Sequence, residues 1–496
     1  MQYARPEMFK RIPSHLLPRP KAHLLPVYPL VSSLTADHCP PITFRRLQCP
    51  ASGTHNQVAD TLSSLRTGDY AGRTHLKLRE DLREFPREIF DLADTLEILD
   101  LSDNELTDLP ADLSRLHRLR ILFCSGNPIV RLPEVLGQCP QLRMIGFRGC
   151  QLTEVPAASL PPFLRWLILT DNKLTSLPAA LGRCTALEKC MLSGNQLASL
   201  PEEMAACENL ALLRLASNHF ESLPEWLFRL PSLCWLAFSG NPLSPVPAHH
   251  RPLPQIPWTS LRQEAVLGSG ASGVIHRASW HESHPQMPPQ VAVKVFKGAM
   301  TSDGLPASEM AASIAVGTHP NLVEILGELT AHPEGNAGLA LRLIDPSFSN
   351  LAGPPSFDTC SRDVYAEDAR FALPAVVRMA RGIASAAAQL HARGIMHGDL
   401  YAHNIMWQED GACLLGDFGG ASFYPAAGKL PERALERLDV RAFGLLLEEL
   451  LTRCPASGTD QSLVPDLWRL QRACVAPDPS ARPAFAELTQ SFASLD

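Results

Sequence analysis

The chain has 496 residues, which is more than one compact hydrophobic core usually holds, so we expect more than one domain. Its 45% hydrophobic and 19% charged residues exclude an intrinsically disordered protein. A formal net charge of −7 argues against general nucleic-acid binding, which calls for a basic surface. The 13 cysteines are scattered singly, without C-x-x-C or zinc-type spacing, so we expect reduced thiols rather than a disulfide framework.

The first 60 residues are rich in Pro, His and Arg and show no sustained period. We interpret them as a disordered N-terminal lead or as the product of an upstream start codon. Pro26 and Pro29 interrupt the apolar patch at 24–34, which argues against a cleaved signal peptide. No uninterrupted apolar run is as long as the ~18 residues that a membrane helix needs. We therefore expect no membrane span and a cytoplasmic location.

A short motif recurs through residues 74–247 with a period of 23 residues, shortened once to 22. Its frame is L-x-x-L-x-L-x-x-N-x-L-x-x-L-P, and the copy from Leu96 to Pro110 is the most complete. The asparagine slot holds Asn104, Asn127, Cys150, Asn172, Asn195, Asn218 and Asn241. The frame resembles the leucine-rich repeat, in which L-x-L is a short strand and the buried Asn binds the backbone of the neighbouring coil. We expect a leucine-rich-repeat solenoid, or horseshoe, of the α/β class.

The residues beside the inward-facing leucines predict a concave surface with many apolar side chains. These slots hold Ile98, Ile121, Met144, Trp166, Lys189, Leu212 and Trp235, and then Asp100, Phe123, Gly146, Ile168, Met191, Arg214 and Ala237. We expect them to face solvent, and an exposed apolar surface of this kind usually binds a protein partner. The alternative is that the rest of this chain covers the surface.

The period is lost beyond Leu261, where strand-like runs precede helix-like runs. This order favours a β-rich lobe followed by a helical lobe, an α+β domain over residues 261–496. Residues 248–260 are rich in Pro and predict a stiff, extended linker between the two domains.

A glycine-rich hairpin is predicted at the start of this second domain. Gly268, Gly270 and Gly273 follow the pattern G-x-G-x-x-G, whose backbone N–H groups can close over phosphates. Alone, this pattern also fits a plain β-hairpin. The later V-A-V-K places Lys294 on an apolar strand, and Glu309 is the only glutamate between it and the H-P-N-L-V run. We expect Glu309 to pair with Lys294, against the alternative of a solvated helix glutamate.

The stretch H-G-D-L-Y-A-H-N contains Asp399 and Asn404, and D-F-G follows at Asp417. Together with the glycine loop and Lys294, it resembles the protein kinase family over residues 261–496. The resemblance implies a bilobal domain that uses ATP and Mg²⁺. Asp399 would orient and deprotonate an acceptor hydroxyl, Lys294 would hold phosphates, and Asn404 and Asp417 would bind the metal. The remaining implied nucleotide-binding residues are Leu267, Gly268, Ser269, Gly270, Ala271, Ser272, Gly273, Val274, Ile275 and Glu309.

Two further stretches resemble structural motifs of the same family. Leu430-Pro431-Glu432 stands where A-P-E closes the activation segment, and D-V-R-A-F-G at Asp439 resembles D-x-W-S-x-G. The resemblance implies that Glu432 forms a buried ion pair with Arg482, with Glu436 as a competing partner.

The sequence departs from the family at the catalytic loop. Gly398 replaces the arginine of H-R-D, which in the family grips a phosphorylated activation loop, and only 15 residues separate Asp417 from Glu432. We therefore expect activity without loop phosphorylation, controlled instead by the repeats. Tyr401 and His403 leave the acceptor class open, and family frequency favours serine and threonine.

Two other functions remain open. H-G-D-L-x-x-x-N is also the loop of aminoglycoside and choline phosphotransferases, although D-F-G and the predicted Glu432–Arg482 pair favour a protein kinase. A catalytically inactive kinase domain beside a binding solenoid is the third interpretation, and the presence of all the charged positions argues against it.

Overall fold

The computed structural model describes residues 61–246, 252–282, 285–298, 300–424, 432–455 and 463–495, and the side chain of Glu432 is not among the described parts. The lead expected at residues 1–60 lies outside these ranges. We call residues 61–246 the repeat domain and residues 252–495 the C-terminal domain. Both belong to one compact unit of the chain.

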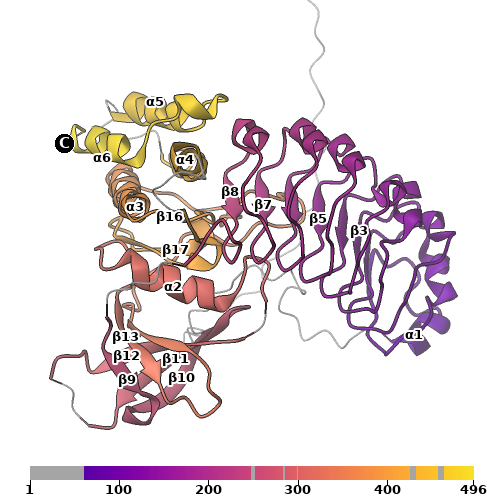
Figure 1. Ribbon diagram of the computed structural model, residues 1–496, viewed down its shortest axis with the longest axis horizontal. Helices are drawn as coiled ribbons and strands as arrows, with labels where there is room; N and C mark the ends of the chain where they lie inside the picture. The colour runs from indigo at the N-terminus through magenta and orange to yellow at the C-terminus, as the bar shows by residue number, and fades with distance from the viewer. Residues whose placement is uncertain are drawn as a thin grey trace, which may run out of the picture. The chain divides into compact units, whose positions relative to one another are not determined.

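Each L-x-L of the repeat frame forms a three-residue strand, and the strands stack in parallel to make one eight-stranded sheet in sequence order (Figure 1). The strands are β1 (His75–Lys77), β2 (Ile98–Asp100), β3 (Ile121–Phe123), β4 (Met144–Gly146), β5 (Trp166–Ile168), β6 (Lys189–Met191), β7 (Leu212–Arg214) and β8 (Trp235–Ala237). The central residues of the strands, such as Leu99 and Leu167, are fully buried in a continuous leucine core. No single repeat could bury such a core alone.

The proline that ends each repeat frame precedes a short 3₁₀ segment on the other side of the coil. Proline fixes φ near −65°, and Pro86 and Pro201 both have φ −62 and extended ψ immediately before such a segment. The segments are η1 (Arg87–Leu92), η2 (Leu113–Arg115), η3 (Glu134–Gln138), η4 (Ala157–Ser159), η5 (Ala179–Arg183), η6 (Glu202–Ala206) and η7 (Glu225–Arg229). Helix α1 (Leu62–Arg66) precedes the first repeat.

The buried asparagines link consecutive coils, as their slot in the frame predicts. Asn172 accepts hydrogen bonds from the backbone N–H groups of Cys150 (3.2 Å) and Leu152 (2.8 Å). Its Nδ2 donates to the carbonyl oxygens of Phe147 (2.8 Å) and Leu169 (2.9 Å). Cys150, in the same slot one repeat earlier, donates from Sγ to the carbonyl of Cys124 at 3.1 Å.

Substituting Asn172 with Ala should therefore destabilise the chain more than substituting Cys150 with Ala. The first change leaves buried backbone donors and acceptors without partners, at about 1–3 kcal/mol for each group, whereas the second removes one weak thiol donor. We expect a loss of ~3 kcal/mol for Asn172→Ala and ~1 kcal/mol for Cys150→Ala. Denaturant unfolding of the two full-length variants measures the difference, and equal losses would contradict this role of the asparagine.

The small lobe of the C-terminal domain is a six-stranded sheet with the order β10-β11-β12-β14-β13-β9 (Figure 1). Its strands are β9 (Gln255–Pro257), β10 (Leu261–Ser269), β11 (Gly273–Trp280), β12 (Gln290–Phe296), β13 (Ile325–Thr330) and β14 (Gly338–Arg342), with η8 (Trp258–Ser260) after β9. Helix α2 (Pro306–Val316) belongs to the same lobe. Strand β9 pairs in parallel with β13, so the second half of the expected 248–260 linker is part of this sheet. The linker prediction was wrong there because Ile256 is buried in the lobe's apolar core.

The large lobe is helical, as the order of the sequence patterns predicts. Its helices are α3 (Leu373–Ala392), α4 (Glu432–Thr452), α5 (Val464–Cys474) and α6 (Phe485–Ala493). The other elements are β15 (Ser349–Asn350), β16 (Ile395–Met396), η9 (Ala402–Asn404), β17 (Ile405–Trp407), β18 (Cys413–Leu415), η10 (Phe418–Gly420), β19 (Ser422–Phe423) and η12 (Pro479–Ala481). Helix α3 buries Val376, Met379, Ile383 and Leu390 along one stripe, as the helical period requires. A solenoid followed by a bilobal domain is the expected fold class.

Within the described ranges, none of the helices is long and apolar enough to cross a membrane.

Candidate active site

The glycine-rich segment forms the hairpin between β10 and β11. Its turn is closed by a hydrogen bond from Gly270 N–H to the carbonyl of Gly273, at 2.9 Å. A Cβ on Gly273 would lie 2.5 Å from the carbonyl oxygen of Val295, so only glycine fits where the hairpin crosses β12. Residues 267–275 therefore form the turn of the hairpin together with the adjoining ends of β10 and β11. This geometry would allow the backbone N–H groups of the turn to cover phosphates.

Lys294 lies on β12, opposite Ile275 of the hairpin, and points toward helix α2. Its ammonium forms an ion pair with the carboxylate of Glu309, which lies on α2 and is only 3% exposed. Helix α2 places the acid there because Pro306, in its first turn, fixes where the helix begins. The structure thus brings together Lys294 and Glu309, the two residues that the sequence predicts to pair. The lysine lies on the strand next to the glycine hairpin.

The predicted catalytic loop follows β16 and includes Asp399, which is 5% exposed. One carboxylate oxygen of Asp399 accepts a hydrogen bond from Asn404 Nδ2 at 2.8 Å. The backbone N–H groups of His397 and Gly398 both donate to the carboxylate of Asp439 on α4, at 2.8 and 2.9 Å. Asp439, from the D-V-R-A-F-G stretch, therefore anchors the loop that presents Asp399.

Asp417 follows β18 and adopts the left-handed conformation, with φ 54. A non-glycine residue in that region carries backbone strain, which is concentrated at functional sites. Its carboxylate caps η10 by accepting from Gly419 N–H at 3.1 Å. The Gly416 N–H donates to the carbonyl of Asn404 at 2.9 Å, so the two predicted metal ligands stand on adjoining segments.

The donor set at this site suits magnesium. Asn404 uses its Nδ2 on Asp399, which leaves its amide oxygen as the atom that could coordinate a cation beside the carboxylate of Asp417. Among the described residues there is no cluster of three or more His, Cys, Asp or Glu side chains that could hold a metal alone. Mg²⁺ is commonly held by one or two protein oxygens together with water and substrate phosphates, so these residues fit it.

Arg482 is fully buried, and its guanidinium donates to three carbonyl oxygens, those of Ala476 (3.0 Å), Arg437 (3.2 Å) and Pro231 (3.0 Å). Burial lowers the pKa of Arg482 to about 10. Its predicted partner Glu432 has a side chain outside the described residues. The competing candidate, Glu436, accepts a hydrogen bond from the Tyr424 hydroxyl at 3.2 Å.

His403 and Tyr401 are both buried, so neither presents a polar group to an acceptor in this conformation. His403 Nδ1 lies 2.7 Å from the carboxylate of Asp363, and Asp363 also accepts from the His403 backbone N–H. Burial alone would lower the pKa of His403, but Asp363 raises it above its usual value. The Tyr401 ring stacks on Trp235 of the repeat domain, with centroids 4.0 Å apart.

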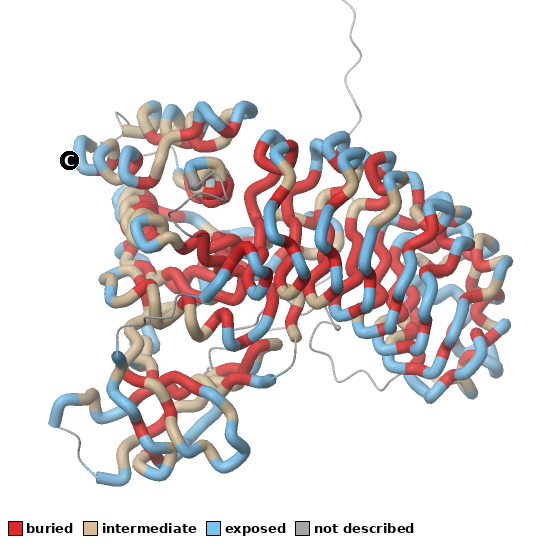
Figure 2. Tube along the Cα trace, in the orientation of Figure 1, coloured by how far each residue is buried: buried red, intermediate tan, exposed pale blue. Residues whose placement is uncertain are grey.

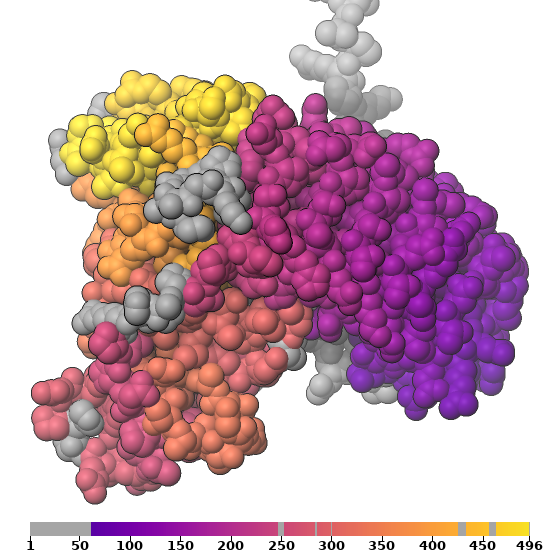
Figure 3. All heavy atoms as spheres, viewed as in Figure 1, coloured from indigo at the N-terminus to yellow at the C-terminus, as the bar shows by residue number. Residues whose placement is uncertain are grey.

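The prediction that the concave residues of the repeats face solvent was wrong. Along β3 to β8 they are buried, and Ile121, Trp166, Leu212 and Trp235 share one apolar cluster with Leu400 and Tyr401. Figure 2 shows these strands in red, and Figure 3 shows the last repeats in contact with the large lobe. An apolar surface of this width is more stable when it is removed from water, and the C-terminal domain covers it.

Two residues of the repeats belong to the site although they were not among its predicted members. Arg214, on β7, forms ion pairs with Asp303 (2.8 Å) and with Asp399, and donates to the carbonyl of Gly398 at 2.8 Å. Trp235, on β8, donates from Nε1 to the carbonyl of Leu400 at 3.1 Å. The sequence offered one indication of this role, because Arg214 is a charged residue among concave positions that mostly hold apolar side chains.

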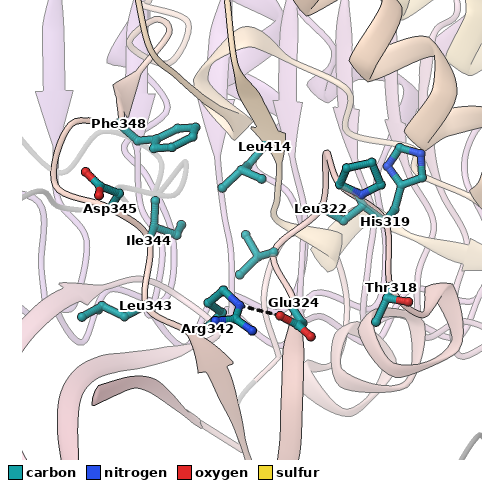
Figure 4. Close-up of a pocket in the computed structure, with 12 residues that line it drawn as sticks. Thr318, His319, Leu322, Glu324, Arg342, Leu343, Ile344, Asp345, Phe348 and Leu414 are labelled. Atoms are coloured by element: carbon teal, nitrogen blue, oxygen red, sulfur yellow. Dashed lines mark hydrogen bonds and ion pairs between the residues drawn. The ribbon is translucent and has the colours of Figure 1, made fainter. Parts of the chain in front are cut away.

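A separate cavity of about 480 Å³ lies between the loop before β13, the segment after β14, and β18 (Figure 4). Leu322, Ile344 and Leu414 line it, and an ion pair between Arg342 and Glu324 stands at one side. None of residues 267–275, Lys294 or Glu309 lines this cavity, so it is distinct from the predicted nucleotide site.

Replacing Lys294 with Met should lower kcat/KM for ATP-dependent transfer by about 10²–10³, because a preorganised charge is lost where phosphate charge develops. Lys173 offers a control, since it lies exposed on the repeat domain and its Nζ donates to the side chain of Gln151 at 3.4 Å. We expect Lys173→Met to change the rate less than threefold. Steady-state kinetics measures both, and equal effects would remove Lys294 from its assigned role.

Comparison with known proteins matches both domains. A family model described as protein tyrosine and serine/threonine kinase matches residues 261–436, and one described as leucine rich repeats (2 copies) matches residues 94–137. The chain is 30% identical over 279 residues to tyrosine-protein kinase ABL2 of Mus musculus, covering 48% of this chain and 22% of the relative. It is 26% identical over 273 residues to the tyrosine-protein kinase receptor TYRO3 of Danio rerio, covering 46% and 30%.

A third relative, the tyrosine-protein kinase transforming protein Abl of Abelson murine leukemia virus, is 30% identical over 279 residues. That match covers 48% of this chain and 34% of the relative. The chain thus spans between about a fifth and a third of the length of these relatives.

Proposed function

We propose that this chain, which joins leucine-rich repeats to a protein kinase domain, transfers the γ-phosphate of ATP to a hydroxyl group of a protein. The observation that carries the proposal is one geometric arrangement. The Lys294–Glu309 pair lies in the small lobe, the Asp399–Asn404 pair and Asp417 lie in the large lobe, and helix α2, which carries Glu309, packs against η10, which follows Asp417. Phosphoryl transfer needs this set of groups for positioning and charge stabilisation.

Each group has a defined task in the proposed reaction. The glycine hairpin covers the phosphates, and Lys294, fixed by Glu309, binds their oxygens. Asp399 orients the acceptor hydroxyl and takes its proton as the oxygen–phosphorus bond forms and the bond to ADP breaks. Asn404 and Asp417 would hold Mg²⁺, which neutralises charge on the phosphates when bound.

The supporting arguments disagree on whether the phosphate is accepted by tyrosine or by serine and threonine. Serine or threonine was favoured by family frequency alone, whereas three relatives carry tyrosine kinase names. His403 also stands where some tyrosine kinases have arginine. We therefore place tyrosine first and retain serine and threonine as the alternative. Peptide acceptors that differ only in this hydroxyl residue separate the two.

Independence from activation-loop phosphorylation is supported by the described part of that segment. Ser422 is fully buried, and its Oγ accepts from Phe238 N–H at 2.9 Å. Tyr424 is 4% exposed. Residues 425–431 lie outside the described ranges. We expect phosphatase treatment to leave the transfer rate unchanged, and strong loss of activity on dephosphorylation would contradict this.

We keep the cytoplasm as the proposed compartment, because the cysteines among the described residues are free thiols, as a reducing environment favours. A protein ligand on the concave face, which the repeats suggest, has to compete with the C-terminal domain for that surface.

The direct test is transfer from γ-labelled ATP to protein, aminoglycoside and choline acceptors in parallel. We expect label on protein and none on the small molecules. Label on an aminoglycoside or choline alone would favour the small-molecule phosphotransferases. Nucleotide binding without transfer to any acceptor, in the parental chain and in the opened variants described below, would favour an inactive scaffold.

A further inference from the structure

Both oxygens of the Asp399 carboxylate have partners in this structure, and one of the two partners comes from the repeats. One oxygen of Asp399 is paired with Arg214 of the repeats, and the other accepts from Asn404. A general base must come within about 2.6–3.2 Å of the proton that it removes. The contact with Asn404 belongs to the proposed active arrangement, so Arg214 is the partner that stands in place of an acceptor hydroxyl, at a carboxylate whose side chain is only 8% exposed.

The arginine that blocks Asp399 is itself firmly held. Arg214 is 1% exposed, and its three guanidinium nitrogens bind Asp303, the Gly398 carbonyl and Asp399. Burial alone would lower the pKa of Arg214, but the carboxylates of Asp399 and Asp303 raise it, so the side chain stays charged. A charged guanidinium bound by two carboxylates is a strong, directional contact.

The neighbouring repeat covers the rest of the acceptor side. Trp235 stacks on Tyr401 and binds the Leu400 carbonyl. Beyond it, Phe238 N–H and the Ser244 hydroxyl bind residues 422 and 423, directly after the D-F-G turn. The strip between the catalytic loop and the activation segment, where a polypeptide must lie to reach Asp399, is therefore occupied.

Gly398 shows that the loop and the repeats fit each other closely. A Cβ at this position would lie 2.3 Å from the carbonyl oxygen of Leu236 on β8, and its φ of +67 also favours glycine. An arginine here, as in H-R-D, would collide with the repeat backbone. The departure from the family motif thus has a physical cause in the packed repeats and in the neighbouring Gly420, whose carbonyl oxygen would lie 2.6 Å from the same Cβ.

The nucleotide side is not covered in this way. Among the described residues, hydrogen bonds and ion pairs from the repeats do not reach residues 267–275, Lys294 or Glu309. The Lys294–Glu309 pair is formed. The repeats do contact residues 300–303, the loop between β12 and α2, but the Lys294–Glu309 pair is formed while Asp399 is paired with Arg214.

We propose, resting on the kinase function above, that the repeat domain is an intramolecular cap that blocks protein acceptors by pairing Arg214 with Asp399. The cap is released by a protein ligand that takes over the concave face. The contacts indicate the chemistry of this ligand. Its carboxylates would pair with Arg214 in place of Asp399 and Asp303, and its aromatic ring would stack on Trp235 in place of Tyr401. An acidic, aromatic polypeptide segment fits this surface.

Two opening variants and one control test the cap in the full-length chain. Arg214→Met removes the pair with Asp399, and Trp235→Ala removes the stack on Tyr401 without leaving a carboxylate unpaired. Arg131→Met is the control, because Arg131 is also an arginine of the repeats and pairs with Glu154 at 3.0 Å on the exposed surface of the repeat domain. Thermal unfolding identifies any variant that fails to fold.

Two readouts separate this proposal from the proposed function. The first is phosphotransfer to a peptide, which we expect to rise at least tenfold in both opening variants and less than twofold in the control. The second is carbodiimide labelling of Asp399 followed by peptide mapping, which reports access without requiring activity. Label should appear in the opening variants and be low in the parental chain and the control.

The combined outcomes decide between the two ideas. Labelled Asp399 without transfer in the opening variants would refute the kinase function and leave the cap in place. Equal labelling in the parental chain would overturn the cap. If the parental chain transfers phosphate, folded opening variants that are no faster would overturn it as well. If neither variant folds, the parental chain decides: a saturating Asp- and Tyr-containing polypeptide should increase deuterium uptake at residues 398–401, from which the repeats are displaced, whereas unchanged uptake there overturns the proposal.

Discussion

Replacing Asp399 with Asn should lower phosphotransfer by about 10²–10⁴, because the amide keeps the shape of the side chain but cannot accept the proton of the acceptor hydroxyl. Nucleotide binding should stay close to the parental value, since Lys294, Glu309 and the glycine hairpin are unchanged. Initial-rate kinetics and titration with a fluorescent nucleotide measure the two properties.

Asp410 supplies the control for this substitution. It lies on the same lobe with its side chain 61% exposed and pairs with Arg378 at the surface, so Asp410→Asn should change the rate less than twofold. An Asp399→Asn chain that transfers phosphate at the parental rate would show that another group is the base.

The second large effect is expected at Asp439, which has no exposed surface. Its carboxylate accepts from the His397 and Gly398 N–H groups, and His391 Nε2 lies 3.0 Å from it. Asp439→Ala would leave these buried groups without a partner, and such losses cost about 3–5 kcal/mol. We expect this loss in the stability of the C-terminal domain, together with loss of activity, because the loop that carries Asp399 is no longer anchored.

Chemical denaturation compares Asp439→Ala with Asp466→Ala. Asp466 is on α5 and pairs with Arg469 three residues later at the surface, where an ion pair contributes about 0–1 kcal/mol. Similar losses for the two variants would contradict the anchoring role of Asp439.

Much of this arrangement could be predicted from the sequence because it is local. The repeat period determines the strands and the asparagine hydrogen bonds, since each contact joins positions about one period apart. The Lys294–Glu309 pair also follows from order along the chain, because the strand and the next helix offered one glutamate. Contacts of this kind need no knowledge of how domains pack.

The features that were missed depend on packing between distant segments. Arg214 and Asp399 are 185 residues apart, and nothing in either motif indicates that they meet. The apolar concave face was interpreted first as a partner site, with coverage by the rest of the chain as the alternative that the structure bears out, because sequence alone cannot distinguish the two. Strand β9 was missed for a similar reason, since three residues of a Pro-rich segment pair with β13 only in the folded lobe.

The most direct test of the whole account compares Arg214→Met with the double variant Arg214→Met/Asp399→Asn in the full-length chain. Transfer of the γ-phosphate of ATP to a tyrosine peptide and to a matched serine peptide is measured for both, with the parental chain alongside. The account predicts that Arg214→Met phosphorylates peptide at least tenfold faster than the parental chain and that the double variant is inactive. Equal peptide phosphorylation by the single and double variants, or label on small-molecule acceptors alone, would contradict it.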